Sequence, residues 1–284
     1  MEIQWFPGHM SKARKLLQDN LKLVDAVIEV VDARIPASSR NPMLEEIVGQ
    51  KPLLVVLNKA DLAAPDLTAR WEDHFRAGGL EALSVDSVRG TGVGRIARKV
   101  KQMAGKKTVS PGSPGRLPRP PRCMIAGIPN VGKSFLINSL VRKKAAKTGN
   151  RPGVTRGQQW IRIGEVDLLD TPGILWPKFD DPEVGYRLAV TGAIRDQVFD
   201  VEAVARRLAG WLAANHPDKV RARYRMDVLR PEEPEEMLYL IGKSRGFVQQ
   251  GGKVDIYKAA VLLLKEFREG ALGRYTLEQP PSLG

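Results

Sequence analysis

Gly127-Ile128-Pro129-Asn130-Val131-Gly132-Lys133-Ser134 is the stretch of the sequence that decides the fold. It fits the pattern GxxxxGK[ST], follows an apolar run that begins at Cys123, and opens a helical pattern that extends to Val141. In that setting the backbone amides of the loop surround a β-phosphate, the lysine contacts the β- and γ-phosphates, and the serine hydroxyl ligates Mg²⁺. The stretch therefore predicts a phosphate-binding loop in an α/β domain. The alternative is a chance glycine-rich turn, which the strand before it and the helix after it disfavour.

A second motif, Asp170-Thr171-Pro172-Gly173, directly follows an expected strand at 166–169. In a phosphate-loop enzyme this position supplies an aspartate on the magnesium side and a glycine amide that senses the γ-phosphate. Thr155 lies between the helix and the next strand, where its hydroxyl can reach the same ion. We therefore predict a magnesium site formed by Ser134, Thr155 and Asp170. Taken alone, the DTPG motif is a common turn.

A third motif, Asn58-Lys59-Ala60-Asp61, lies at the carboxyl end of the apolar run 53–57, where ligands of open α/β sheets bind. The Asp61 carboxylate can accept hydrogen bonds from N1–H and N2–H of guanine, which adenine does not present in that arrangement. Asn58 and Lys59 brace this pocket, and Ser87, beside Asp86, adds a backbone contact. The alternative for this motif is an ordinary strand-end turn.

The order of these motifs is rotated relative to ordinary small GTPases, in which the phosphate loop comes first and the base-reading motifs come last. We therefore expect a circularly permuted P-loop GTPase domain with a mostly parallel sheet, because short β-branched runs alternate with helical patterns. A basic, proline-rich segment at 105–122 is placed to bridge the former termini.

Composition narrows the class of protein further. The chain has 284 residues, of which 43% are hydrophobic and 27% are charged, as in average globular proteins. No run approaches a membrane span and the start does not resemble a signal peptide, so we expect a cytoplasmic protein that does not bind membranes. The single cysteine, Cys123, reads as a core residue. The formal charge of +13 favours a polyanionic partner, although a solubilising surface explains such a charge equally well.

Beyond Leu175 the pattern becomes helical, with apolar residues at three- and four-residue spacing in 182–193, 201–214, 233–241 and 254–267. We therefore expect three parts. These are an N-terminal arm and helix at 1–22, the permuted GTPase domain at 23–178, and a small all-α domain at 179–284.

These motifs, in this order, resemble the circularly permuted GTPases of the YlqF/YawG group over nearly the whole chain. The similarity also takes in Trp5 to Met10, Asp32-Ala33-Arg34, Arg151 to Thr155, Gln159-Trp160 and Asp170 to Lys178. The resemblance implies a GTP-hydrolysing factor, expected as a monomer, that acts in late maturation of the large (50S) ribosomal subunit and is stimulated by the ribosome. It also implies that the C-terminal helices bind ribosomal RNA through basic residues, namely Arg187, Arg195, Arg206, Arg207, Arg221, Arg223, Arg225, Lys243, Arg245 and Lys253.

Hydrolysis needs a group that orients water, and Ile174 stands where small GTPases generally carry a glutamine. The resemblance points to His9, on an arm made mobile by Gly8, whereas the residues alone favour a packed or surface histidine. Asn130 lies where potassium-stimulated GTPases hold K⁺, although it can equally serve to shape the loop. Phe135 departs from the small threonine usual in the family, while its amide can still serve the α-phosphate.

The nucleotide-binding residues predicted in this way are Asn58, Lys59, Asp61, Asp86, Ser87, Asn130, Val131, Gly132, Lys133, Ser134, Phe135 and Gly173. They imply GTP as substrate and GDP as product. Two rival functions stay open at this point. One is an ATP-driven P-loop enzyme, which the Asn58 to Asp61 motif disfavours, and the other is an RNA-binding protein that holds GTP only as a structural or switch ligand.

Overall fold

A computed structural model of the chain describes residues 8–105, 119–148, 160–171, 173, 181–226, 230 and 232–281. The chain divides into two compact units. The first unit spans Gln4–Lys178, and the second unit includes Phe179–Tyr275. The residues from Thr276 onward group with the first unit.

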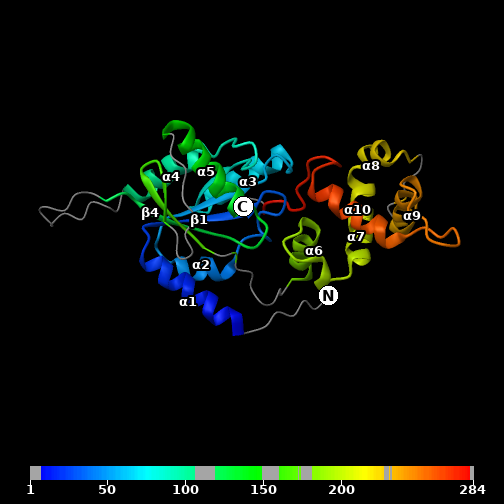
Figure 1. Cartoon of the computed structure of the whole chain (residues 1–284), viewed down its shortest axis with the longest axis horizontal. Helices are drawn as coiled ribbons and strands as arrows, with labels where there is room; N and C mark the ends of the chain where they lie inside the picture. The colour runs from blue at the N-terminus through cyan, green and yellow to red at the C-terminus, as the bar shows by residue number, and fades with distance from the viewer. Residues whose placement is uncertain are drawn as a thin grey trace, which may run out of the picture. The chain divides into compact units, whose positions relative to one another are not determined.

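A six-stranded sheet forms the centre of the first unit (Figure 1), with the strand order β3-β2-β1-β4-β6-β5. The strands are β1 (Ala26–Asp32), β2 (Leu53–Asn58), β3 (Glu81–Ser84), β4 (Arg122–Ala126), β5 (Trp160–Ile163) and β6 (Val166–Asp170). All neighbours pair in parallel except β5 and β6. The strand that leads into the phosphate loop, β4, lies beside β1, which precedes it in sequence. This order confirms the circularly permuted α/β fold.

β1 and β2 are buried along their whole length, as their nearly continuous apolar sequences predict. Their register places Asp32, the last residue of β1, opposite Asn58, the last residue of β2. Cys123 in β4 is 1% exposed, which confirms it as a core residue. The carboxyl ends of three adjacent strands therefore present their following loops at the same edge.

Helices cover the sheet on both faces. The helices of this unit are α1 (Gly8–Lys22), α2 (Pro42–Val48), α3 (Pro65–Ala77), α4 (Gly94–Gly105) and α5 (Lys133–Thr148). Figure 1 shows α1 and α2 below the sheet and α4 and α5 above it. Leu17 and Leu21 of α1 pack with Leu44 of α2 against Val27 of β1. Trp71 and Phe75 of α3 pack in a second cluster against Val55 and Leu57 of β2.

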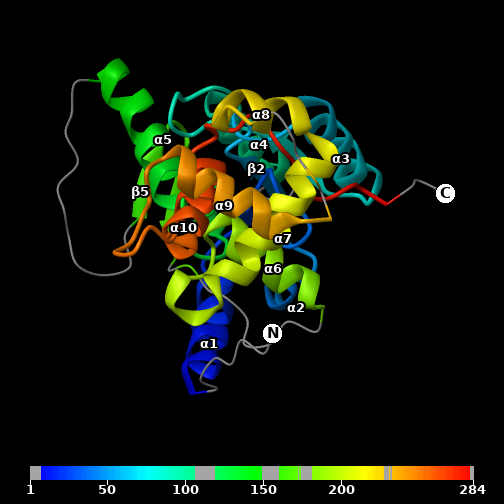
Figure 2. The same ribbon diagram turned by 90° about the vertical axis from the view of Figure 1, so that its right-hand side faces the viewer.

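The second unit is helical among its described residues, apart from an isolated bridge between Val248 and Val254. Figure 2 displays its helices, which are α6 (Pro182–Thr191), the 3-10 turn η1 (Asp196–Val198), α7 (Val201–Asn215), α8 (Pro217–Tyr224), α9 (Pro234–Ser244) and α10 (Ile256–Arg268). α7 buries Val204, Leu208 and Leu212. The sequence predicts α6, α7, α9 and α10 but not α8, whose charged residues hide its apolar period. Among the described helices, none is both long enough and apolar enough for a bilayer crossing.

Candidate functional site

The predicted nucleotide-binding residues lie at the carboxyl edge of the sheet, at the ends of β2, β3, β4 and β6 and on the loops that follow them. The glycine-rich loop 127–132 joins β4 to α5, and Lys133 is the first residue of that helix. The base-reading motif continues directly from β2, which is separated from β4 only by β1. The fold therefore brings together two motifs that lie about 70 residues apart in the sequence.

Lys133 lies across the phosphate loop. Its Nζ donates to the carbonyl oxygens of Gly127 at 2.9 Å and Ile128 at 2.8 Å. The residue is only 9% exposed, and burial lowers the pKa of the ammonium to about 8, against the opposing effect of the Asp170 carboxylate. An ammonium held over a loop of backbone amides at a helix start is arranged to bind a polyphosphate.

Gly173 approaches this lysine closely. A Cβ atom at position 173 would lie 2.8 Å from Lys133 Nζ and 3.2 Å from two backbone atoms of Pro129, so any larger residue would require the lysine and the loop to shift. Asp170 ends β6, where partial burial raises the pKa of its carboxyl and the neighbouring Lys133 charge lowers it. Gly173 therefore lies beside the phosphate loop. Ser134 is exposed in the first turn of α5, and Thr155 lies outside the described residues.

Asn58 connects the base-reading motif to the phosphate loop. Its side chain is fully buried, and its Nδ2 donates to the carbonyl of Val131 at 2.8 Å. Its Oδ1 accepts from the backbone amide of Ser87 at 3.3 Å. The side chain of Asn58 thus joins three segments of the predicted pocket through hydrogen bonds.

Gly132 permits this connection. Its φ of +95° is in the region that favours glycine, and a Cβ atom there would lie 2.3 Å from Asn58 Nδ2. Any side chain at position 132 would therefore separate the phosphate loop from the base-reading motif.

A buried ionic network, which the sequence analysis did not assign to the site, supports Lys59. Lys59 Nζ donates to Asp32 Oδ2 at 2.9 Å and to the carbonyl of Asn130 at 2.7 Å. Asp32 also accepts two bonds from the guanidinium of Arg34, at 2.9 and 2.7 Å. Arg34 is 1% exposed and Asp32 is 2% exposed. The two cations hold the pKa of the Asp32 carboxyl far below its usual value, despite the opposing effect of burial, while burial lowers the pKa of Lys59.

The sequence does contain a signal for this network, because an Asp-Ala-Arg triplet lies at the end of a buried strand. In the sequence alone, the triplet supports only the resemblance to the family. Its ion pair with Lys59 cannot be inferred there, because that pair depends on the parallel register of β1 and β2. Asp32 and Arg34 therefore join the candidate site as supporting residues.

Asp61 is partly exposed in the turn between β2 and α3, so its carboxylate is accessible to a base. Asp86 and Ser87 are each 5% exposed in the loop after β3. The Asp86 carboxylate accepts from the amides of Val88 and Arg89, both at 2.9 Å. Asp86 thus holds the shape of the loop that presents Ser87.

Three further candidates differ in their surroundings. Asn130 has a left-handed backbone with φ of +61°, a conformation that asparagine tolerates better than most residues. Phe135 is 62% exposed, so its ring does not fill space under the loop. The backbone of His9 is helical, in the first turn of α1, where the sequence suggests a mobile arm.

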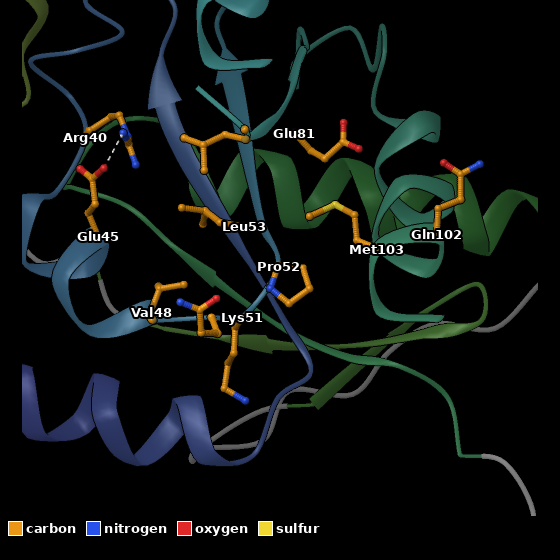
Figure 3. Close-up of a pocket in the computed structure, with 13 residues that line it drawn as sticks. Arg40, Glu45, Val48, Lys51, Pro52, Leu53, Glu81, Gln102 and Met103 are labelled. Atoms are coloured by element: carbon orange, nitrogen blue, oxygen red, sulfur yellow. Dashed lines mark hydrogen bonds and ion pairs between the residues drawn. The ribbon is translucent and has the colours of Figure 1, made fainter. Parts of the chain in front are cut away.

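A cavity of about 780 Å³ lies elsewhere, at the amino ends of β2 and β3. Figure 3 shows Pro52 and Leu53 at the start of β2, Glu81 at the start of β3, and Met103 of α4 around it. It contains no predicted site residue and lies at the opposite end of β2 from Asn58. We place the candidate site at the carboxyl edge because the phosphate loop and the buried polar network are there.

Comparison with known proteins identifies the family to which the chain is similar. Residues 122–211 match the family model described as "50S ribosome-binding GTPase". Ribosome biogenesis GTPase A of Bacillus cereus is 49% identical, with 100% of this chain and 96% of that protein covered. Mitochondrial ribosome-associated GTPase 1 of Mus musculus is 36% identical over 97% of this chain and 90% of that protein.

Two solved structures share the fold over nearly the whole chain. GNP-bound YlqF from T. maritima has a TM-score of 0.65 at 24% identity and covers 96% of this chain and 100% of that one. The GDP-bound structure of the same protein has a TM-score of 0.62 at 25% identity and covers 94% of this chain and 100% of that one.

Proposed function

This chain belongs to the ribosome biogenesis GTPase A family of circularly permuted GTPases, and from that premise we propose that it acts on the large ribosomal subunit late in its maturation. It is a GTP-hydrolysing enzyme of ribosome biogenesis. The finer parts of the proposal are the subunit, stimulation by the ribosome, the residues that bind nucleotide and metal, the ribosomal RNA contact, a monomeric state and a cytoplasmic location.

One observation carries the nucleotide part of the proposal. The Asn58 side chain joins the base-reading motif to the phosphate loop through the 2.8 Å bond to Val131, so a single nucleotide can span both. Asp61 then reads N1–H and N2–H of guanine, and the amide of Ser87 lies next to the base. A bound adenine would leave the Asp61 carboxylate without its donors, which explains selection against ATP.

At the other end of the nucleotide, Lys133 moves its donors from loop carbonyls to phosphate oxygens, and the amides of Gly132 to Phe135 face the phosphates. The Ser134 hydroxyl and the Asp170 carboxylate are hard oxygen donors on two segments that approach each other at Lys133 and Gly173, a donor set that fits Mg²⁺. Thr155 adds the third protein ligand in this proposal. A magnesium ion held by these residues would neutralise charge that develops on the phosphate oxygens.

The group that orients the attacking water does not belong to the nucleotide-binding motifs in this proposal. Ile174 has no polar atom with which to orient water, so the group comes from another segment. We assign it to His9, whose neutral imidazole orients water or accepts its proton. The second proposed contribution to hydrolysis is a K⁺ ion held near Asn130. The alternative is that asparagine stands at this position only because it tolerates the left-handed backbone.

The helical unit is the proposed site of ribosomal RNA binding. Several of its basic residues already form ion pairs within the unit: Arg206 with Glu235, Arg207 with Glu183, and Arg223 with Glu266. Exposed Arg195, Lys243 and Lys253 are therefore stronger candidates for phosphate contacts than the paired residues.

The decisive test is GTP hydrolysis with and without purified large subunits, first in potassium and then in sodium. We expect subunits to raise the rate and potassium to raise it further. A rate that is unchanged by subunits would contradict ribosome stimulation, and equal rates in the two salts would contradict the K⁺ site. Replacement His9→Ala should remove the stimulation and leave GDP affinity unchanged. Loss of both would give His9 a structural role.

A further inference from the structure

The C-terminal segment Thr276–Gln279 crosses the two loops that support the base-reading motif, and we refer to it as the strap. Every contact described for it lies within the first unit. Figures 1 and 2 show the C-terminal end of the chain, in red, near α3. No residue of the strap belongs to the predicted nucleotide site.

Thr276 joins the loop after β1 to the loop after β2. Its hydroxyl accepts from the amide of Ala64 at 3.1 Å and lies 3.4 Å from the carbonyl of Ala33. Ala64 ends the turn that contains Asp61 and precedes α3, while Ala33 lies between Asp32 and Arg34. The Thr276 side chain, which is 7% exposed, thus connects the loop after β1 with the end of the turn that contains Asp61.

The next residue reaches the ionic network. The amide of Leu277 donates to the carbonyl of Arg34 at 2.8 Å. The Arg34 guanidinium and Lys59 Nζ both donate to the Asp32 carboxylate, and Lys59 Nζ also donates to the carbonyl of Asn130 in the phosphate loop. A continuous series of hydrogen bonds therefore runs from the strap to the nucleotide loops.

Glu278 fixes the strap in place. Its carboxylate is 5% exposed and accepts from the amides of Ala37 at 2.7 Å and Ser38 at 3.0 Å, and also from the Ser38 hydroxyl. Its carbonyl accepts from Nε1 of the buried Trp71 at 3.1 Å. A buried carboxylate with several donors is a strong anchor, because removing it leaves those donors unpaired.

We propose that the strap is a positioning element for guanine recognition, with Glu278 and Thr276 as positioning residues that hold the Asp61 turn and the Asp32–Lys59 pair in the geometry that reads the base. This inference rests on the proposed role of Asp61. It predicts that guanine selectivity, and not only folding stability, depends on the last residues of the chain.

The test compares GDP with inosine diphosphate, which lacks the 2-amino group that Asp61 reads. In Glu278→Ala we expect GDP affinity to fall roughly tenfold and the preference for GDP over inosine diphosphate to fall several-fold. The isosteric Thr276→Val should change both quantities in the same direction by a smaller factor. The matched control is Gln279→Ala, because Gln279 accepts only an exposed bond from Arg70 at 3.1 Å among its described contacts, and it should behave as wild type.

Calorimetric titrations and thermal unfolding of the same full-length samples separate positioning from stability. An unchanged preference in both Glu278→Ala and Thr276→Val would overturn the inference, even if both proteins unfold at a lower temperature. Should Glu278→Ala not fold, Thr276→Val decides alone by the same criterion. A wild-type protein without preference for GDP over inosine diphosphate would instead reject the reading of guanine by Asp61, so the two failures are distinguishable.

Discussion

The two ends of the proposed nucleotide site are built differently. At the base end, Asn58, Asp32 and Arg34 are buried and hydrogen-bonded to several loops. At the phosphate end, Ser134 and Asp170 are exposed, and Lys133 donates to carbonyls of its own loop. The base end is therefore preorganised by the protein, whereas the phosphate end gains its full set of partners from the ligand.

This difference has a physical reason. Guanine is uncharged and is recognised by the direction of a few hydrogen bonds, which requires fixed acceptors. Phosphates and Mg²⁺ carry large charges that attract their partners over several ångströms, so their ligands need less prior order. A change at the phosphate end should therefore affect mainly binding energy and rate, and a change at the base end should affect mainly selectivity.

The largest expected effect comes from removing the phosphate-loop cation. Lys133→Met should reduce single-turnover GTP hydrolysis by about 1,000-fold, because the variant loses a buried charge that stabilises the developing negative charge. The control is Lys101→Met, since Lys101 is exposed and pairs with Glu165 far from the loop in sequence. Hydrolysis by Lys133→Met within tenfold of wild type would contradict the assignment of the phosphate end.

The next effect tests the base end. Asp61→Asn should weaken GDP binding roughly 100-fold, because an amide cannot accept from both N1–H and N2–H of guanine. It should improve relative binding of xanthosine diphosphate, whose carbonyl at position 2 accepts from the new amide. Titration with both nucleotides measures the change in their relative affinity. The control is Asp66→Asn, at the exposed start of α3. Equal losses for both nucleotides would mean that Asp61 does not contact the base.

The sequence predicted most of this arrangement, and the reasons differ between the two ends. The phosphate loop and the Asn58 to Asp61 motif are local patterns whose spacing encodes their geometry, and alternating apolar runs predict the parallel sheet between them. Asp32 and Arg34 could not be assigned in the same way, because their partner Lys59 is brought close only by strand register. The strap was missed for a similar reason. The sequence analysis assigns it to the all-α domain at 179–284, because its partners lie more than 200 residues away in the chain and leave no local pattern.

The pH dependence of binding provides a smaller, graded test of the phosphate end. Burial lowers the pKa of Lys133 to about 8, and a bound polyphosphate raises it by favouring the ammonium. Above that pH the free protein holds neutral lysine, so GDP binding takes up a proton and affinity falls by up to about tenfold per pH unit. Below about pH 7 the lysine is charged in both states and this dependence disappears.

Calorimetry in two buffers with different ionisation enthalpies measures the proton uptake directly. At about pH 9 we expect an uptake approaching one proton for wild type and none from this group in Lys133→Met. Equal uptake in both proteins would assign the titration to another residue.

The smallest expected effect concerns Phe135, which the family resemblance singles out as a departure. Its ring is 62% exposed, whereas the neighbouring Leu136 and Ile137 are buried. Phe135→Thr should therefore change GDP affinity by less than about twofold, since the backbone amide that serves the α-phosphate is retained. A change of tenfold or more in the GDP titration would contradict this. It would mean that the exposed ring contacts the nucleotide, and that the phosphate end selects its ligand by a side chain as well as by charge.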